Sequence, residues 1–215
     1  MDTQLSFVGG HFIDLQKIGD DSIIVDAGAC IGEFIEALHR HEQGMKCKIM
    51  ALECDRDNIK TLKEKNYYNV TIYPKALIGN NSDGKIIFYQ YLGLPHSGNV
   101  GFIKKYLLNH KDFRGMLKYE VEILRINDIF SALNVDRINY MKMNIEGAER
   151  DVLGMMTKKT ASKIDHVSVS IHANFLPGIS YSTITERLVE LGFDAWKAGD
   201  REIYGIFNSK KRDLC

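Results

Sequence analysis

The sequence lacks the charge imbalance that is typical of proteins that bind nucleic acid or anionic membranes. Lys plus Arg and Asp plus Glu both number 28 among the 215 residues, so the formal net charge at pH 7 is zero. Short basic runs at 104–105, 158–159 and 210–212 are typical of solvated surface. We therefore expect no nucleic-acid partner.

Long apolar runs are also missing. No run approaches the roughly 20 residues of a membrane-spanning helix, and the first residues lack a basic stretch followed by an apolar one. We expect a cytoplasmic protein without membrane insertion. The length fits one α/β domain over 1–215, in which 1–21 form a weakly patterned N-terminal extension.

The cysteines form no metal or disulfide pattern. There are four, Cys30, Cys47, Cys54 and Cys215, and no two stand in a Cys-x-x-Cys pair. The sequence thus indicates no metal site. Cys30 and Cys54 each follow a predicted strand, so we expect two reduced thiols side by side in a pocket.

What the sequence does contain is a strand, a glycine turn and a helix at 23–33. Three β-branched residues precede Asp26, Gly28 and Gly32 follow, and apolar residues then recur at helical spacing. This order is typical of the first unit of a nucleotide-binding α/β sheet. Glycines let the backbone approach a ligand, and the helix start offers free N–H groups.

The glycine spacing narrows the choice of ligand. A dinucleotide fingerprint beginning at Gly28 fails at two of its three glycine positions, and no Gly-Lys-Ser/Thr of a phosphate loop follows. Asp-x-Gly-x-x-x-Gly instead resembles motif I of class I S-adenosylmethionine (SAM) methyltransferases. The resemblance implies SAM as cofactor and the following contacts: Asp26, Gly28, Ala29, Cys30 and Gly32.

Two later strand ends support this assignment. A second apolar strand at 47–53 ends in Glu53, about twenty residues after the glycine turn, where a carboxylate is expected to accept the ribose hydroxyls. Cys54 follows it at the same edge. A third strand at 70–73 precedes Ala76, which we expect beside the adenine ring.

Beyond residue 80 the simple alternation of strand and helix stops. Strands at 85–91 and 119–126 are expected to pair as a β excursion on the sheet edge. The long mixed segment between them, 92–118, is our candidate for substrate recognition. Strands at 193–197 and 202–208 are too close for a parallel crossover and should form an antiparallel hairpin.

Polar residues end the fourth and fifth strands, at 139–144 and 166–172. Lys142, Asn144, Glu146 and His172 should converge at the carboxyl edge of the sheet and form the catalytic group. His172 is the first choice of base because its ordinary pKa is near neutrality, and Glu146 is the second. Asn144 can orient a ligand but cannot take a proton.

With these residues in place, the chain resembles the FkbM family of SAM-dependent methyltransferases. That family shows Asp-Val-Gly-Ala-Asn-Ile-Gly at its first block and Lys-Ile-Asp-Val-Glu-Gly-Ala-Glu at its second, matched here by 26–32 and 142–149. The resemblance covers about 23–172. It implies a Rossmann-like α/β fold, a mostly parallel seven-stranded sheet with an antiparallel last strand, and O-methylation of hydroxyls on sugars or small metabolites.

Three positions depart from the family pattern. Cys30 stands where the family usually has Asn, Asn144 replaces an Asp, and Ser170 stands where an acid often precedes the strand-end His. The chain thereby loses two candidate bases or metal ligands.

Three hypotheses follow. The first is an O-methyltransferase acting on a small hydroxylated acceptor. The second is a SAM-dependent enzyme for an amine, a protein or RNA. The third is a non-catalytic module that binds SAM or S-adenosylhomocysteine. An NAD-dependent oxidoreductase is disfavoured by the glycine spacing.

Overall fold

The computed structural model describes residues 3–41, 46–79, 84–94, 96, 98–101, 108–172 and 180–210. The basic run at 104–105, residue Cys215 and part of segment 92–118 (95, 97 and 102–107) therefore lie outside the described residues.

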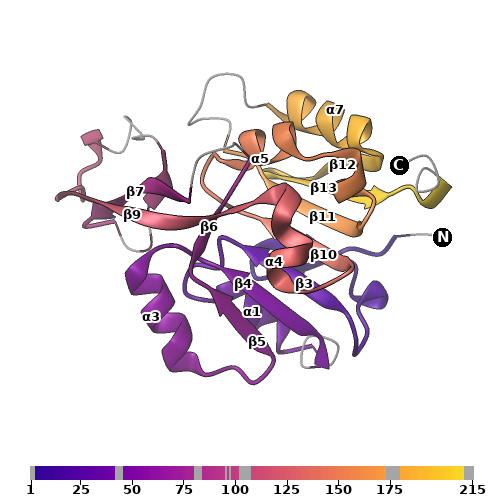
Figure 1. Ribbon diagram of the computed structural model, residues 1–215, viewed down its shortest axis with the longest axis horizontal. Coiled ribbons are helices and arrows are strands. Elements are labelled where there is room, and N and C mark those ends of the chain that lie inside the picture. The colour runs from indigo at the N-terminus through magenta and orange to yellow at the C-terminus, as the bar shows by residue number, and fades with distance from the viewer. Residues whose placement is uncertain are drawn as a thin grey trace.

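The centre of the fold is a seven-stranded sheet in the order β12-β13-β11-β10-β3-β4-β5 (Figure 1). Its strands are β3 (Ile23–Ala27), β4 (Lys48–Leu52), β5 (Val70–Tyr73), β10 (Ile138–Met143), β11 (Ile164–Ser170), β12 (Phe193–Gly199) and β13 (Glu202–Phe207). Only β13 runs antiparallel to its neighbours, β11 and β12. The predicted parallel sheet with an antiparallel last strand and a closing hairpin is confirmed.

Helices cover both faces of this sheet. They are η1 (Leu15–Lys17), α1 (Glu33–Leu38), α3 (Arg56–Lys65), η3 (Ile126–Asp128), α4 (Ile129–Leu133), α5 (Glu149–Met155), α6 (Lys158–Ala161) and α7 (Tyr181–Leu191). Side chains alternate along each strand, so Val25 packs with α4, α5 and α7 while Ile24 packs with α1 and α3. Two apolar layers result, one on each face.

Local capping explains where α3 begins and ends. Asp55 accepts the N–H groups of Asp57 and Asn58, and Asn66 ends the helix in the left-handed conformation. The helix therefore spans Arg56–Lys65.

The β excursion forms a sheet of its own. Strands β6 (Lys75–Ile78), β9 (Gly115–Arg125), β7 (Lys85–Leu92) and β8 (Gly98–Val100) lie in that order, and β9 extends well beyond the main sheet (Figure 1). The predicted pairing of β7 with β9 is confirmed, with Lys85 opposite Glu122. The predicted placement of this β excursion on the edge of the main sheet is wrong. Pro74 has no N–H to continue the ladder after β5, and the chain leaves to pair β6 with β9.

The N-terminal extension is a hairpin of β1 (Ser6–Val8) and β2 (His11–Ile13), with Gly9 and Gly10 in its turn. The turn lies against the start of α1, where a Cβ on Gly9 would come within 2.6 Å of Cα of Phe34. The hydroxyl of Tyr140 donates to the carbonyl of Phe12 at 2.9 Å. These contacts fix the hairpin at the carboxyl edge of the sheet.

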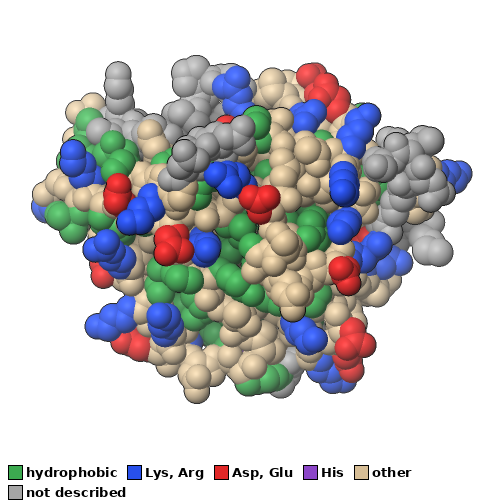
Figure 2. Space-filling view, in the orientation of Figure 1, with side chains coloured by type: hydrophobic (Ala, Val, Ile, Leu, Met, Phe, Trp, Pro, Cys, Tyr) green, Lys and Arg blue, Asp and Glu red, His purple; other side chains and the backbone are tan. Residues whose placement is uncertain are grey.

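Figure 2 shows that Lys, Arg, Asp and Glu side chains are interspersed on one face of the molecule, without a large field of one sign. Among the described residues, no helix is both long and apolar enough to cross a membrane.

Substitution of Gly28 tests how closely the turn after β3 approaches the backbone after β10. Its φ is +76°, and a Cβ there would lie 1.9 Å from the carbonyl oxygen of Asn144. We expect Gly28→Ala to lower the free energy of unfolding by about 3 kcal/mol or more, because strain and a backbone clash add. Urea unfolding of purified protein measures this change.

Gly84 provides the matched control. Its φ is +75°, but a Cβ at this position would have no atom within 4 Å, so Gly84→Ala carries the backbone strain alone. That variant should lose about 1 kcal/mol. Equal losses in both variants would contradict a close approach at Gly28.

Candidate active site

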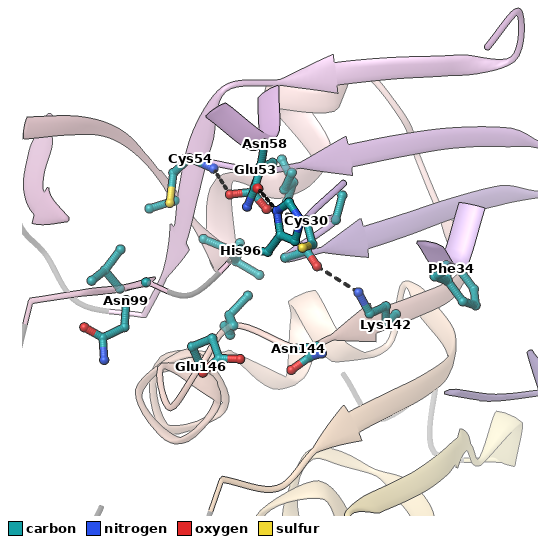
Figure 3. Close-up of a pocket in the computed structure, with 18 of the residues that line it drawn as sticks. Cys30, Phe34, Glu53, Cys54, Asn58, His96, Asn99, Lys142, Asn144 and Glu146 are labelled. Atoms are coloured by element: carbon teal, nitrogen blue, oxygen red, sulfur yellow. Dashed lines mark hydrogen bonds between the residues drawn. The ribbon is translucent and has the colours of Figure 1, made fainter. Parts of the chain in front are cut away.

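A cavity of about 170 Å³ opens at the carboxyl ends of β3, β4 and β10. The turn after β3, the end of β4, the start of β6, strand β8 and the loop after β10 form its wall (Figure 3). It brings together most of the residues expected from the sequence: Gly28, Ala29, Cys30, Glu53, Cys54, Ala76, Lys142, Asn144 and Glu146. Asp26 and Gly32 lie behind this wall, and His172 lines a neighbouring cavity.

The carboxylate of Glu53 is held by hydrogen bonds directly after the end of β4. One carboxylate oxygen accepts the N–H of Cys30 at 2.7 Å, and the other accepts the N–H groups of Cys54 and Asp55, both at 2.8 Å. Burial raises the pKa of Glu53 to about 7, although these three N–H donors pull it down. The result is a fixed, buried acceptor whose charge changes near neutral pH.

The two thiols expected side by side do line the same cavity. Burial raises the pKa of Cys30 to about 11 and that of Cys54 well above its usual range. Both are therefore neutral thiols at pH 7, which suits small wall residues better than nucleophiles.

Lys142 and Asp26 form a buried ion pair across β10 and β3. The Lys142 ammonium lies 2.7 Å from Oδ1 of Asp26 and donates to the carbonyl of Gly28 at 2.8 Å. Lys142 is 3% exposed and Asp26 is fully buried. We expected Asp26 to touch the cofactor and Lys142 to take part in catalysis, but both charged groups are engaged within the protein. They shape the turn on which Gly28 and Ala29 are presented.

Asn144 and Glu146 lie where the first cavity meets a wider one of about 1170 Å³. Both residues line both cavities. Oδ1 of Asn144 is buried and accepts no hydrogen bond from the described residues. Glu146 adopts a left-handed backbone with φ of 60°. An acceptor without a partner, at the place where the two cavities meet, is suited to accept a hydrogen bond from a ligand.

His172 lies between two carboxylates in the wider cavity. Its Nδ1 is 2.9 Å from Glu149, and its Nε2 is 3.6 Å from Glu146. Burial disfavours the charged imidazole, but hydrogen bonds and charge from both glutamates outweigh it and raise the pKa of His172 to about 9. A group protonated at pH 7 cannot accept a proton there, so the expected role of His172 as base needs correction.

No pattern in the sequence pointed to His11 as a site residue. Its side chain lines both cavities, with Nδ1 at 3.2 Å from Oε1 of Glu202 at the start of β13. The N–H of Phe12 donates to the same carboxylate at 3.2–3.3 Å. The only local signal was the Gly9-Gly10 turn before His11, since Glu202 stands 191 residues away.

Segment 92–118 also contributes to the first cavity. His96 lines it, and its Nδ1 lies 2.9 Å from Oδ1 of Asn58, which is buried at the start of α3. The described part of this segment therefore meets the cavity that holds Glu53 (Figure 3).

Comparison with known proteins identifies the family of the chain. The family model of the methyltransferase FkbM domain matches residues 26–195. The chain belongs to the FkbM family of SAM-dependent methyltransferases. The match confirms the resemblance stated from the sequence, and with it SAM as the cofactor.

Individual relatives are more distant. Methyltransferase 1 of Beauveria bassiana (strain ARSEF 2860) is 26% identical over 170 residues, covering 74% of this chain and 68% of that protein. The crystal structure of an FkbM methyltransferase from Methylobacillus flagellatus KT superposes with a TM-score of 0.53 at 18% identity, over 87% of this chain and 44% of that chain. This chain thus spans less than half of that FkbM structure. A Methanococcus jannaschii fibrillarin pre-rRNA processing protein has a TM-score of 0.53 at 12% identity, over 95% and 71% of the two chains. These structures share the fold.

The residues that line the first cavity have the chemistry that SAM requires. The buried Glu53 carboxylate suits the paired ribose hydroxyls, and the unsatisfied Oδ1 of Asn144 suits the ammonium of the methionine part. Ala76 lines the wall from β6 and offers an apolar surface to the adenine ring. Among the described residues, no three His, Cys, Asp or Glu side chains gather in a way that would hold a metal ion.

The buried ion pair is open to a direct test. Lys142→Ala leaves the Asp26 carboxylate buried and unpaired, so we expect a loss of about 3–5 kcal/mol in the free energy of unfolding. The matched control is Lys65→Ala, which removes an exposed pair with Glu36 at 2.9 Å and should cost about 1 kcal/mol or less. Denaturant unfolding measures both. Similar small losses would mean that the buried pair is dispensable.

Proposed function

We propose that this protein transfers the methyl group of SAM to a hydroxyl oxygen of a small acceptor such as a sugar. The observation that carries this proposal is the meeting of two cavities at Asn144 and Glu146. One suits SAM, and the other is a wider space lined by polar groups. Bound SAM supplies a methyl group on a positively charged sulfur.

The residues at the junction suit a neutral hydroxylated acceptor. Transfer to oxygen is an in-line displacement, in which positioning supplies much of the rate and a base removes one proton. Asn144, Glu146 and Ser170 offer hydrogen-bond partners to hydroxyl groups along the wall of the wider cavity. Balanced surface charge on the visible face supports a small neutral acceptor over RNA (Figure 2).

Isotope transfer tests the acceptor class. The protein is incubated with SAM labelled in its methyl group and with separate panels of aryl glucosides and phenols, of amines, and of RNA. We expect label in hydroxylated acceptors, as methyl ethers that resist alkali. Label confined to amines or RNA would contradict the proposal. SAM binding without transfer to any acceptor would favour the non-catalytic module.

Glu53 gives cofactor binding a pH dependence. Because its pKa is about 7, the carboxylate that accepts the ribose hydroxyls is scarce at pH 6 and abundant at pH 8. The dissociation constant of SAM should therefore fall up to about tenfold between these pH values. Isothermal titration calorimetry measures it, with Glu53→Gln as the variant whose binding should be weaker and independent of pH.

The raised pKa also predicts a stability effect without SAM. The folded state holds the Glu53 proton more tightly than the unfolded state, whose carboxyl titrates near 4.5. The contribution of Glu53 to the free energy of unfolding is therefore complete below about pH 4.5 and is lost as the pH rises through 7. Glu53→Gln should lack that loss. Identical pH–stability curves would mean that Glu53 is already ionised in the folded protein.

A further inference from the structure

The wider cavity is lined by segments that lie far apart in the sequence. The β1–β2 hairpin and the start of α1 form one side, and the loop after β10, the end of β11 and the β12–β13 turn form the other. Its volume of about 1170 Å³ exceeds the upper range of common small-molecule sites, about 1,000 Å³. It therefore admits an acceptor larger than a single sugar ring.

His11 is placed at the boundary between this cavity and the SAM cavity. It lines both of them, and Nδ1 is taken by Glu202. Nε2, on the opposite edge of the ring, makes no hydrogen bond with the described residues. The ring stands edge-on to Phe34 with centroids 5.8 Å apart. One ring nitrogen is thus held while the other remains for a ligand.

The position of His11 is fixed by its neighbours on the hairpin. The N–H of Phe12 donates to both oxygens of Glu202, and the carbonyl of Phe12 accepts from Tyr140. Gly9 lies against the backbone of α1. His11 and Glu202 are 6% and 4% exposed. A base held this firmly loses little freedom when an acceptor binds.

The other candidates at the junction are engaged with one another or lack a basic atom. His172 is held as a cation between Glu146 and Glu149. Glu146 is paired with that cation at 3.6 Å. Asn144 has no basic atom.

We propose that the methyl acceptor binds in the wider cavity and that Nε2 of His11, oriented by Glu202, accepts the proton of its hydroxyl. This inference rests on the proposed function. In the step, the O–H bond breaks and the proton forms an N–H bond with the lone pair of Nε2. The oxygen pair forms the bond to the methyl carbon as the carbon–sulfur bond breaks, and that pair stays on sulfur. Glu202 then faces the imidazolium across Nδ1.

The surrounding charges set the pH at which this pair can act. His11 faces Glu202 on β13, Lys142 on β10, Asp26 on β3 and His172 after β11, with Glu33 and Glu146 on the same cavity wall. Burial and then Lys142 lower the pKa of His11 to about 3, and burial raises that of Glu202 to about 8. Nε2 of His11 is free of a proton only after Glu202 has lost its own proton. The rate of methyl transfer should therefore rise with pH through about 8.

Nitrogen NMR tests the pair without any acceptor. The full chain is labelled with [¹⁵N]histidine and saturated with S-adenosylhomocysteine, and His11→Gln identifies the signal of His11. Above pH 8 we expect a protonated Nδ1 and a bare Nε2. A protonated Nε2 at pH 9 would overturn the proposal, because that nitrogen could not accept a proton.

Kinetics with the most active hydroxylated acceptor of the transfer panel test the role in catalysis. His11→Gln should lower kcat by about 100-fold or more, while the dissociation constant of SAM stays within about threefold. Glu202→Gln should lower kcat and remove the rise near pH 8, a change that loss of packing alone would not produce. His41→Gln, which alters an imidazole outside both cavities, is the control and should leave kcat unchanged.

The outcomes separate the two proposals. If wild-type protein binds SAM and methylates only amines or RNA, the proposed function fails whatever the NMR result. If hydroxyl methylation proceeds and His11→Gln retains a third or more of wild-type kcat, the function stands and His11 is not the base.

Discussion

The buried pair of Lys142 and Asp26 is the constraint on which the site depends. It joins the two central strands, and its ammonium also holds the Gly28 carbonyl. That contact sets the turn after β3, from which the N–H of Cys30 reaches Glu53. Two charges leave water at considerable cost, and the cost is offset only by close geometry. The turn that carries Gly28, Ala29 and Cys30 is therefore held by electrostatic interactions within the sheet.

Two histidines at the carboxyl edge show how neighbours decide protonation. His172 lies between two carboxylates and holds its proton at neutral pH. Burial and then the charge of Lys142 lower the pKa of His11, so its ring is neutral at pH 7. The same side chain thus serves as a fixed cation at one position and as a neutral ring at the other.

The sequence predicted the parts of the fold that depend on local pattern. The strand, turn and helix at 23–33, the position of Glu53 and the closing hairpin all follow from hydrophobic periodicity and spacing. The separate sheet of β6 to β9 and the partners of His172 depend on contacts between distant segments. The pairing of His11 with Glu202 is of the same kind, and no local pattern in either segment predicts it.

The contact between His11 and Glu202 also has a consequence for biosynthesis. The residues around Glu53, Lys142 and Glu146 leave the ribosome well before Glu202 does. The hairpin of β1 and β2 therefore lacks its carboxylate anchor until the segment that carries Glu202 has been synthesised. Anchoring of the hairpin must then close a loop of 191 residues, which carries an entropic cost. A chain interrupted before Glu202 would therefore lack the contact that orients the ring of His11.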